Sequence, residues 1–287
     1  MKVQRWVTAY VLKPLPSHHR SFAFSDGASI YRCAAQHCGA RWLVKMDVTG
    51  FFGSISAIQV YRVFQDAGYE PLVAFELARL TTYTPAVSSR FTHLEWGTRG
   101  RRYPIREYRS DHIGYLPQGA PTSPMLSNLV MKPIDAELES IARKAGVVFT
   151  RYSDDITFSA RGSFTRAKAH RLIWATKRTL AKIGMRPNDR KTVIIPPGAR
   201  KVVLGLLVDG CDPRLTREFR SILRQHLYYL EQYGPRGHAE KRNFDSIWGM
   251  YRHIRGLIDF ANMVQPEYAA AMLTRFNAIS WPDQSKP

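Results

Sequence analysis

The sequence has few cysteines and no long apolar run, and both absences narrow what the chain can be. Its 3 cysteines include no Cys-x-x-Cys pair, so neither a disulfide framework nor a usual zinc site is predicted. There is no run of about 18 apolar residues and no short charged-then-apolar leader, which argues against a membrane span or a signal peptide. We therefore expect a cytoplasmic protein without a membrane partner.

Acidic residues are also scarce relative to basic ones. The 287 residues include 42 Lys+Arg against 23 Asp+Glu, for a formal net charge of +19. Because this excess is spread along most of the sequence and not confined to a tail, we expect a polyanionic partner, with nucleic acid as the first candidate. A hydrophobic content of 45% is enough for a substantial core, in one large domain or a few subdomains.

Two adjacent acids, Asp154 and Asp155, stand between short runs of β-branched and aromatic residues. These runs predict a hairpin with the acid pair at its tight turn, which would place charge on a rigid tip. On an extended chain the two side chains diverge, so they could converge on one ion only where the turn breaks the alternation. Ordinary turn chemistry is the alternative for such a pair.

A third acid, Asp47, ends a predicted strand over 42–47. An acid at the end of a buried strand is unfavourable unless it is solvated, paired or bound to a metal. The alternative is a helix cap or a satisfied turn residue. Ser54 follows shortly and is predicted to cap a helix that carries Ile58 and Phe64.

A loop rich in glycine and proline, Leu116-Pro-Gln-Gly-Ala-Pro-Thr-Ser-Pro124, leads into a helix predicted to start at Ser127. Such a loop could press backbone amides and the Gln118 amide against a substrate, although proline and glycine alone would mean only a turn. The segment before it, roughly 83–113, combines arginines with aromatic residues. That mixture suits phosphates and stacked bases, and a solvated surface hairpin is an equal alternative.

The other segments predict a mixed α/β part followed, from about Asp212, by a basic helical appendage. Cys33, His37 and Cys38 could contact a metal, but small buried residues on a helix are the favoured interpretation. In chain order we expect a strand at 6–12, a helix at 30–39 capped by Ser29, helices at 70–82 and from Phe164, paired strands at 191–196 and 201–208, and further helices from about Asp212.

Three of these features stand in a fixed order that resembles motifs A, B and C of reverse transcriptases. They are the strand ending in Asp47 with Phe51-Phe52, the loop 116–124, and Tyr152-Ser-Asp-Asp155. The loop is the most specific of the three, because it is similar to the bacterial retron form throughout and the similarity continues through Leu126-Ser-Asn128. The resemblance covers roughly Ser25 to Ile279.

The resemblance implies that Asp47, Asp154 and Asp155 are catalytic and hold a pair of Mg²⁺ ions, with the Val48 carbonyl as a further ligand. It also implies a steric gate that excludes a ribose 2′-hydroxyl, a loop beside the incoming nucleotide, and a motif D lysine that protonates or steadies the leaving pyrophosphate. The nucleotide-binding residues implied in this way are Phe52 as the gate, Gln118 and Gly119 in the loop, Tyr152, and Lys191 as the lysine.

The implied fold is α+β: a right-hand polymerase palm, which is an antiparallel sheet packed on helices, with a reduced fingers region and a C-terminal helical thumb. We expect partial fingers at 1–40, the palm at 41–211 with a finger-like insertion at about 83–113, and the thumb at 212–287. Only 46 residues precede Asp47, so either the start codon is placed too late or the fingers are shortened and activity is weak. Expected contacts to nucleic acid are Arg101, Arg102 and Arg255.

The function implied is that of a bacterial, cytoplasmic RNA-directed DNA polymerase that copies a structured noncoding RNA into DNA. Its partners would be the template RNA, the RNA–DNA product, deoxynucleotides and an effector protein in anti-phage defence. Alternatives are a group II intron or diversity-generating reverse transcriptase, or a reverse-transcriptase-like RNA-binding protein with weak activity. Cys33 replaces a retron asparagine, and Val203-Leu204-Gly205 replaces a retron Val-Thr-Gly, but neither position belongs to the metal or nucleotide site.

Overall fold

A computed structural model describes residues 1–84, 95–97, 107–109 and 113–282 of the chain. The chain forms two compact units, Met1–Ala199 and Arg200–Pro287, which are described separately. The second unit begins before the predicted boundary at Asp212, because three short strands between residues 202 and 215 pair with one another. The division into fingers, palm and thumb stays a prediction.

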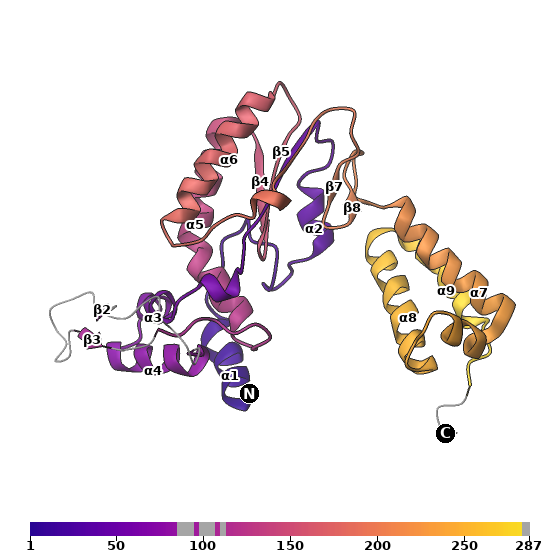
Figure 1. Cartoon of the computed structure of the whole chain (residues 1–287), viewed down its shortest axis with the longest axis horizontal. Helices are drawn as coiled ribbons and strands as arrows, with labels where there is room; N and C mark the ends of the chain where they lie inside the picture. The colour runs from indigo at the N-terminus through magenta and orange to yellow at the C-terminus, as the bar shows by residue number, and fades with distance from the viewer. Residues whose placement is uncertain (85–94, 98–106, 110–112, 283–287) are drawn as a thin grey trace. The chain divides into compact units, whose positions relative to one another are not determined.

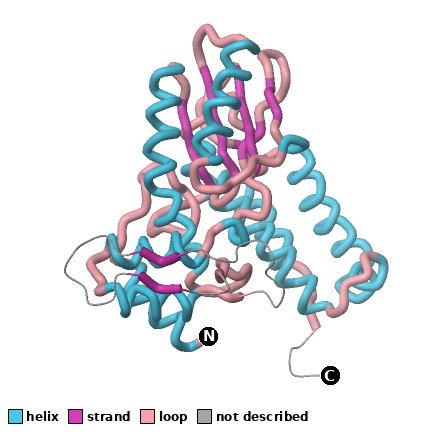
Figure 2. The backbone as a smooth tube through the Cα atoms, turned by 60° about the vertical axis from the view of Figure 1, so that its left-hand side comes forward, coloured by secondary structure: helices cyan, strands magenta, loops and turns pink. Residues whose placement is uncertain are grey.

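The first unit is built on a four-stranded antiparallel sheet with the strand order β4-β5-β1-β6. One face of this sheet packs on two helices through apolar residues that alternate along the strands, such as Val44 and Met46 on β1. Figure 2 shows the strands side by side with helices against them. The bounds are β1 Trp42–Asp47, β4 Val148–Tyr152, β5 Asp155–Ala160, β6 Val193–Ile195, α5 Ser123–Ala145 and α6 Arg166–Ala181.

The opposite face of the sheet carries polar residues that are satisfied by the helix α2, Ile30–Ala35, and the turn after it. The two ring nitrogens of buried His37 lie 2.7 Å from the hydroxyls of Thr150 and Ser159. Burial also lowers the pKa of His37 to about 3, so the ring is neutral. Because both nitrogens are engaged, the metal alternative for Cys33 and His37 is wrong and the buried-residue interpretation holds.

Several helix starts differ from the prediction in ways that the local sequence explains. The helix α3, Ala57–Asp66, is capped by Ser56 in a capping box with Gln59, and not by Ser54. The helix α5 starts at Ser123, four residues before the predicted start, because Pro124 suits the first turn of a helix. Helix α4, Pro71–Thr81, and the cap of α2 by Ser29 match the prediction, and so do the hairpin strands β4 and β5.

Two predicted strand assignments are wrong. Residues 6–12 are helical: α1, Lys2–Trp6, continues as the π-helical stretch η1, Val7–Leu12, with Val7 and Val11 buried four residues apart. The predicted strand pair after residue 191 also does not form. Instead β6 joins β1 in the main sheet, and β7, Val202–Val203, pairs with β8, Leu206–Leu207.

The described part of the second unit contains a small sheet followed by helices, as the helical pattern after Asp212 predicts (Figure 1). Its core includes the buried residues Leu223, Leu227, Ile254 and Phe276. No helix in the described part of the chain is long and apolar enough to cross a membrane. The remaining bounds are β9 Arg214–Leu215, α7 Arg217–Lys241, α8 Ile247–Val264 and α9 Pro266–Asn277, and in the first unit β2 Glu95–Gly97, which pairs with β3 Glu107–Arg109.

Candidate active site

The three predicted catalytic acids meet at one end of the main sheet. Asp47 and Asp155 are direct cross-strand partners at the ends of β1 and β5. Opposed residues of an antiparallel pair project to the same face with Cβ atoms about 5 Å apart, so these two carboxylates share a face. Asp154 lies in the turn between β4 and β5, and its carbonyl accepts a hydrogen bond from the Val48 N–H at 3.1 Å. Residues far apart in the sequence are thus neighbours in space.

Burial and crowded negative charge together determine the electrostatics of this end of the sheet. Burial, and next the negative charge of Asp154, raise the pKa of Asp155. Lys191 lies at the end of the 3-10 turn η3, Asp189–Lys191, and its Nζ is 3.0 Å from Asp47 Oδ1. This hydrogen bond raises the pKa of Lys191. The ammonium groups of Lys191 and Lys45 therefore partly compensate a group of three acids.

The donor set fits divalent cations such as Mg²⁺. Hard cations prefer oxygen ligands, and here three carboxylates stand on strand ends and a tight turn. The ligand atoms of the three acids are not all within 4.8 Å of one another in the described structure. This spacing is expected, because like charges repel and Lys191 binds the carboxylate of Asp47. A divalent cation would supply positive charge that Lys191 and Lys45 supply only in part.

A buried arginine, which the sequence analysis did not single out, holds the acidic turn. Arg151 and Asp135 have fully buried side chains and form a bidentate pair, with Nε and Nη2 each 2.7 Å from a carboxylate oxygen. Arg151 Nη1 also donates to the carbonyl of Ser153 at 2.9 Å. Ser153 adopts a left-handed φ of 56°, which is unusual for a residue other than glycine. Arg151 thus fixes the turn that carries Asp154.

The loop 116–124, named the substrate loop after its predicted role, is anchored to the segment that follows Asp47. Leu116 N–H donates to the Ile55 carbonyl at 3.0 Å, and Ala57 N–H donates to the Gly114 carbonyl at 2.7 Å. Gln118 and Gly119 are exposed, and Gly119 has a φ of 86°, a region that favours glycine. The amide and glycine of the loop are therefore open to solvent on a fixed base.

Aromatic residues surround the predicted steric gate. Phe52 is half-buried, and its ring centroid lies 5.4 Å from that of Phe51 and 6.5 Å from that of Phe24. Tyr152 is also half-buried and pairs across the hairpin with Asp155. Burial raises the pKa of its phenol. Both side chains lie on elements that adjoin the acids.

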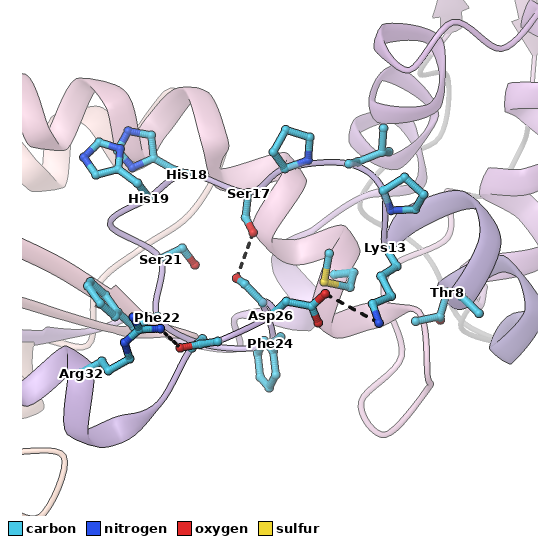
Figure 3. A pocket seen from close by; sticks show the side chains of 18 of the residues that line it. Thr8, Lys13, Ser17, His18, His19, Ser21, Phe22, Phe24, Asp26 and Arg32 are labelled. Atoms are coloured by element: carbon cyan, nitrogen blue, oxygen red, sulfur yellow. Dashed lines mark hydrogen bonds and ion pairs between the residues drawn. The ribbon is translucent and has the colours of Figure 1, made fainter.

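A cavity of about 1160 Å³ lies beside Phe24 in the first unit (Figure 3). Cationic and aromatic side chains line it, including Lys13, Arg32 and Phe22, and Asp26 binds Lys13 across 3.6 Å. Its wall reaches Pro121 of the substrate loop. This composition suits an anionic chain with stacked bases.

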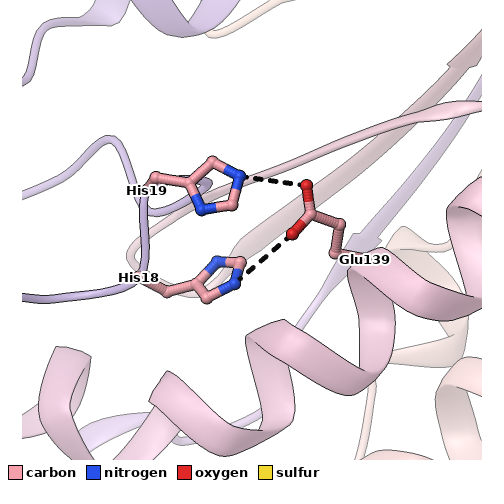
Figure 4. A group of neighbouring side chains, drawn as sticks. All are labelled: His18, His19 and Glu139. Atoms are coloured by element: carbon pink, nitrogen blue, oxygen red, sulfur yellow. Dashed lines mark hydrogen bonds and ion pairs between the residues drawn. The ribbon is translucent and has the colours of Figure 1, made fainter.

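Next to this cavity, His18 and His19 both contact Glu139 of α5 (Figure 4). They are the one group of three or more His, Cys, Asp or Glu residues whose ligand atoms lie within 4.8 Å of each other in the described chain. Arg20 Nε donates to the same carboxylate at 2.9 Å, so the charge of Glu139 is already matched. The group therefore holds the 18–20 segment on α5, and the adjoining Arg20 carbonyl accepts from Arg151 N–H.

The predicted nucleic-acid contacts are placed only in part. Arg101 and Arg102 lie outside the described residues. Arg255 is on α8, partly exposed, and its Nε donates to Asp259 Oδ1 one helical turn away at 3.1 Å. The role of these three arginines stays a prediction.

The raised pKa of Asp155 predicts that this carboxylate destabilises the folded first unit at neutral pH. When the pKa of an acid is higher in the folded state than in the unfolded state, the free energy of unfolding falls as the pH rises from the unfolded pKa to the folded pKa. The Asp155→Asn variant is therefore expected to melt at a higher temperature than the parent chain at pH 7.5. The gain should shrink as the buffer is taken below the unfolded pKa of Asp, about 3.9. Equal melting temperatures at pH 7.5 would contradict the raised pKa assigned to Asp155.

Comparison with known proteins agrees with this geometry. The family model described as reverse transcriptase (RNA-dependent DNA polymerase) matches residues 2–206. The retron Ec86 reverse transcriptase of Escherichia coli is 28% identical over 277 residues, which cover 96% of this chain and 72% of that protein. The Myxococcus xanthus retron Mx162 and Mx65 reverse transcriptases are 28% and 31% identical, with 96% and 95% of this chain covered.

The chain spans 55% and 58% of the length of the two Myxococcus proteins. The matched family region contains all three acids, the substrate loop and Lys191. Of these, the structure brings the acids and Lys191 to one end of the sheet. The chain therefore belongs to the reverse transcriptase (RNA-dependent DNA polymerase) family and is similar to retron reverse transcriptases.

Proposed function

We propose that this chain synthesises DNA on a structured noncoding RNA template, with deoxynucleotides as substrates and a pair of Mg²⁺ ions at the three acids. The observation that carries the proposal is the cross-strand pairing of Asp47 with Asp155 beside the Asp154 turn. The positive charge of the chain, +19, supports a nucleic-acid partner. The noncoding RNA template, and a defence role alongside a separate effector protein, are proposed from the resemblance to retron reverse transcriptases.

The acids are the residues proposed to hold the metal, with the Val48 carbonyl beside them. When bound, a pair of divalent cations would stabilise the attacking and leaving oxygens of phosphoryl transfer. The chain itself fixes the positions of these ligands, because Asp47 and Asp155 are held by sheet hydrogen bonds and Asp154 by the turn. Positional rigidity of this kind is what a phosphoryl-transfer site requires of its protein.

Other side chains at this end of the sheet are proposed to bind and orient the nucleotide. Gln118 and Gly119 offer an amide and an exposed backbone on the anchored loop. Lys191 carries a cation next to Asp47 and would steady or protonate the pyrophosphate that leaves. Tyr152 would support the nucleotide from the hairpin.

The proposal is tested by primer extension. The purified chain is mixed with an RNA template, an annealed DNA primer and labelled deoxynucleotides, with Mg²⁺ or with EDTA. Extension in Mg²⁺ that stops in EDTA is the expected result. Tight RNA binding without any extension would mean that the chain is an RNA-binding relative of the polymerases and would overturn the proposal.

The half-buried ring of Phe52 predicts the sugar preference of the enzyme. Its packing against Phe51 and Phe24 limits how far the ring can move, so a 2′-hydroxyl placed against it would clash. The Phe52→Val variant is expected to raise the efficiency of ribonucleotide incorporation relative to deoxynucleotide by about 100-fold, the size of effect that one or two pocket methylenes produce. Competing single-nucleotide insertions measure the ratio. An unchanged ratio in an active variant would remove Phe52 from the gate.

A further inference from the structure

The long helix α7 of the second unit is a hairpin of two helices. His226 Nδ1 and His238 Nε2 lie 2.9 Å apart although 12 residues separate them. Along a straight helix that separation would be about 18 Å. The reversal occurs at Gly234, whose φ of 67° and ψ of 174° lie outside the helical region, and Pro235 follows. The second half of α7 therefore folds back on the first.

A cavity of about 760 Å³ lies between the two halves of this hairpin. Three aromatic rings line it in a stacked row. The ring centroid of Tyr229 lies 6.0 Å from that of Tyr233 and 5.8 Å from that of His238, and the interplanar angles are 26° and 23°. The hydrogen bond between His226 and His238 fixes the His238 ring, whereas Tyr233, at the other end of the row, is 67% exposed. An exposed flat ring on a fixed row is a surface on which another ring can stack.

The polar groups of the cavity are cationic or neutral. Lys241 and Arg242 line it together with the amide of Gln225. None of the described residues that line it is acidic. A site with this composition attracts an anion next to a flat ring. Arg242 Nη2 donates to Gln225 Oε1 at 3.4 Å, so it is the NH₂ group of the Gln225 amide that can bond to the edge of a base.

We propose that this cavity, Tyr229, Tyr233 and His238 with Gln225, Lys241 and Arg242, binds one unpaired base of a structured RNA together with its phosphate. The inference deepens the proposed function, because it assumes that structured RNA is the partner. Any base can stack on such a row of rings, so we expect the site to select unpaired bases with little preference for their identity. An apolar groove would instead indicate a protein partner, but this cavity places the cations Lys241 and Arg242 beside stacked rings, which indicates RNA.

The test uses two short RNA hairpins that differ only in one bulged 2-aminopurine, which is paired in the control hairpin. The intact chain is expected to bind the bulged hairpin about 10-fold more tightly, and to quench its fluorescence as the base stacks. The Tyr233→Leu variant should lose the preference and the quenching. Because Tyr233 is exposed, the melting temperature of the Tyr233→Leu variant should equal that of the parent chain. The matched control is Tyr228→Leu, an exposed ring on the same helix that does not line the cavity.

Equal affinity of the parent chain for both hairpins, or equal losses in the Tyr233 and Tyr228 variants, would overturn the inference. Displacement of the bulged hairpin by ATP at concentrations near the hairpin's own affinity would assign the cavity to free nucleotides instead. Primer extension on a generic RNA template tests the proposed function separately from this inference, because the Tyr233→Leu variant should still extend the primer. A chain that fails to extend any primer but prefers the bulged hairpin would overturn only the polymerase proposal.

Discussion

DNA synthesis is expected to fall by at least about a thousand-fold when Asp154 is replaced by asparagine. Removal of a charged ligand forfeits several kcal/mol of charge stabilisation in the transition state, and about 4 kcal/mol corresponds to about a thousand-fold in rate. The amide fits the same turn, whose backbone bond from Val48 does not involve the side chain. The fold and RNA affinity should therefore be preserved, as circular dichroism and filter binding can measure.

The matched control for this variant is Asp189→Asn. Asp189 is an exposed acid on the adjoining η3 turn, where it pairs with Lys177 at the surface. Surface ion pairs contribute little to stability, so both the fold and the rate should remain close to those of the parent chain. Primer extension at the parental rate by Asp154→Asn would rule out the assigned role, and equal losses in both variants would point to a nonspecific effect of charge.

The second large effect is expected from the buried pair of Arg151 and Asp135. The Arg151→Met variant leaves the Asp135 carboxylate buried without a partner, which costs about 3–5 kcal/mol of folding free energy. In a unit of this size that loss lowers the melting temperature by roughly 10 °C. The variant also removes the donor to the Ser153 carbonyl, so synthesis should fall by about 100-fold through misplacement of Asp154.

A double variant separates positioning from stability. Replacing both partners, as in Arg151→Met with Asp135→Leu, removes the unpaired charge, so most of the lost melting temperature should return. Synthesis should stay low, because the Ser153 carbonyl still lacks its donor. Recovery of both stability and synthesis in the double variant would show that Arg151 acts only through the fold.

The sequence predicts most of this site because its elements have short-range signals. The hairpin around Asp154 follows from β-branched runs on both sides of a turn, and the strand ending in Asp47 follows from a short apolar segment. What joins these elements is long-range pairing, such as Asp47 opposite Asp155, and the order of motifs is the only sequence signal for it. Arg151 was missed because a lone arginine in a strand does not reveal that Asp135, on α5, will meet it.

The wrong assignments have similar physical causes. Residues 6–12 are almost all apolar, so neither a strand nor a helix period stands out, and packing of Val7 and Val11 decides for a helix. Both segments after residue 191 have a high β propensity, which does not tell which strands pair, and β6 pairs with β1 instead of with the next strand. The reversal within α7 has a sequence signal in Gly234-Pro235, because glycine and proline interrupt helices, but the sequence analysis did not use it.

The central claim is that Asp47, Asp154 and Asp155 form one divalent-cation centre. Manganese is a spectroscopic probe for such a centre, and electron paramagnetic resonance can count the Mn²⁺ bound per chain with a chain-terminated primer, an RNA template and the next deoxynucleotide. The parent chain is expected to bind a pair of ions, and Asp47→Asn and Asp154→Asn are each expected to bind fewer, with Asp189→Asn unchanged. The same Mn²⁺ stoichiometry in all four proteins would contradict the account.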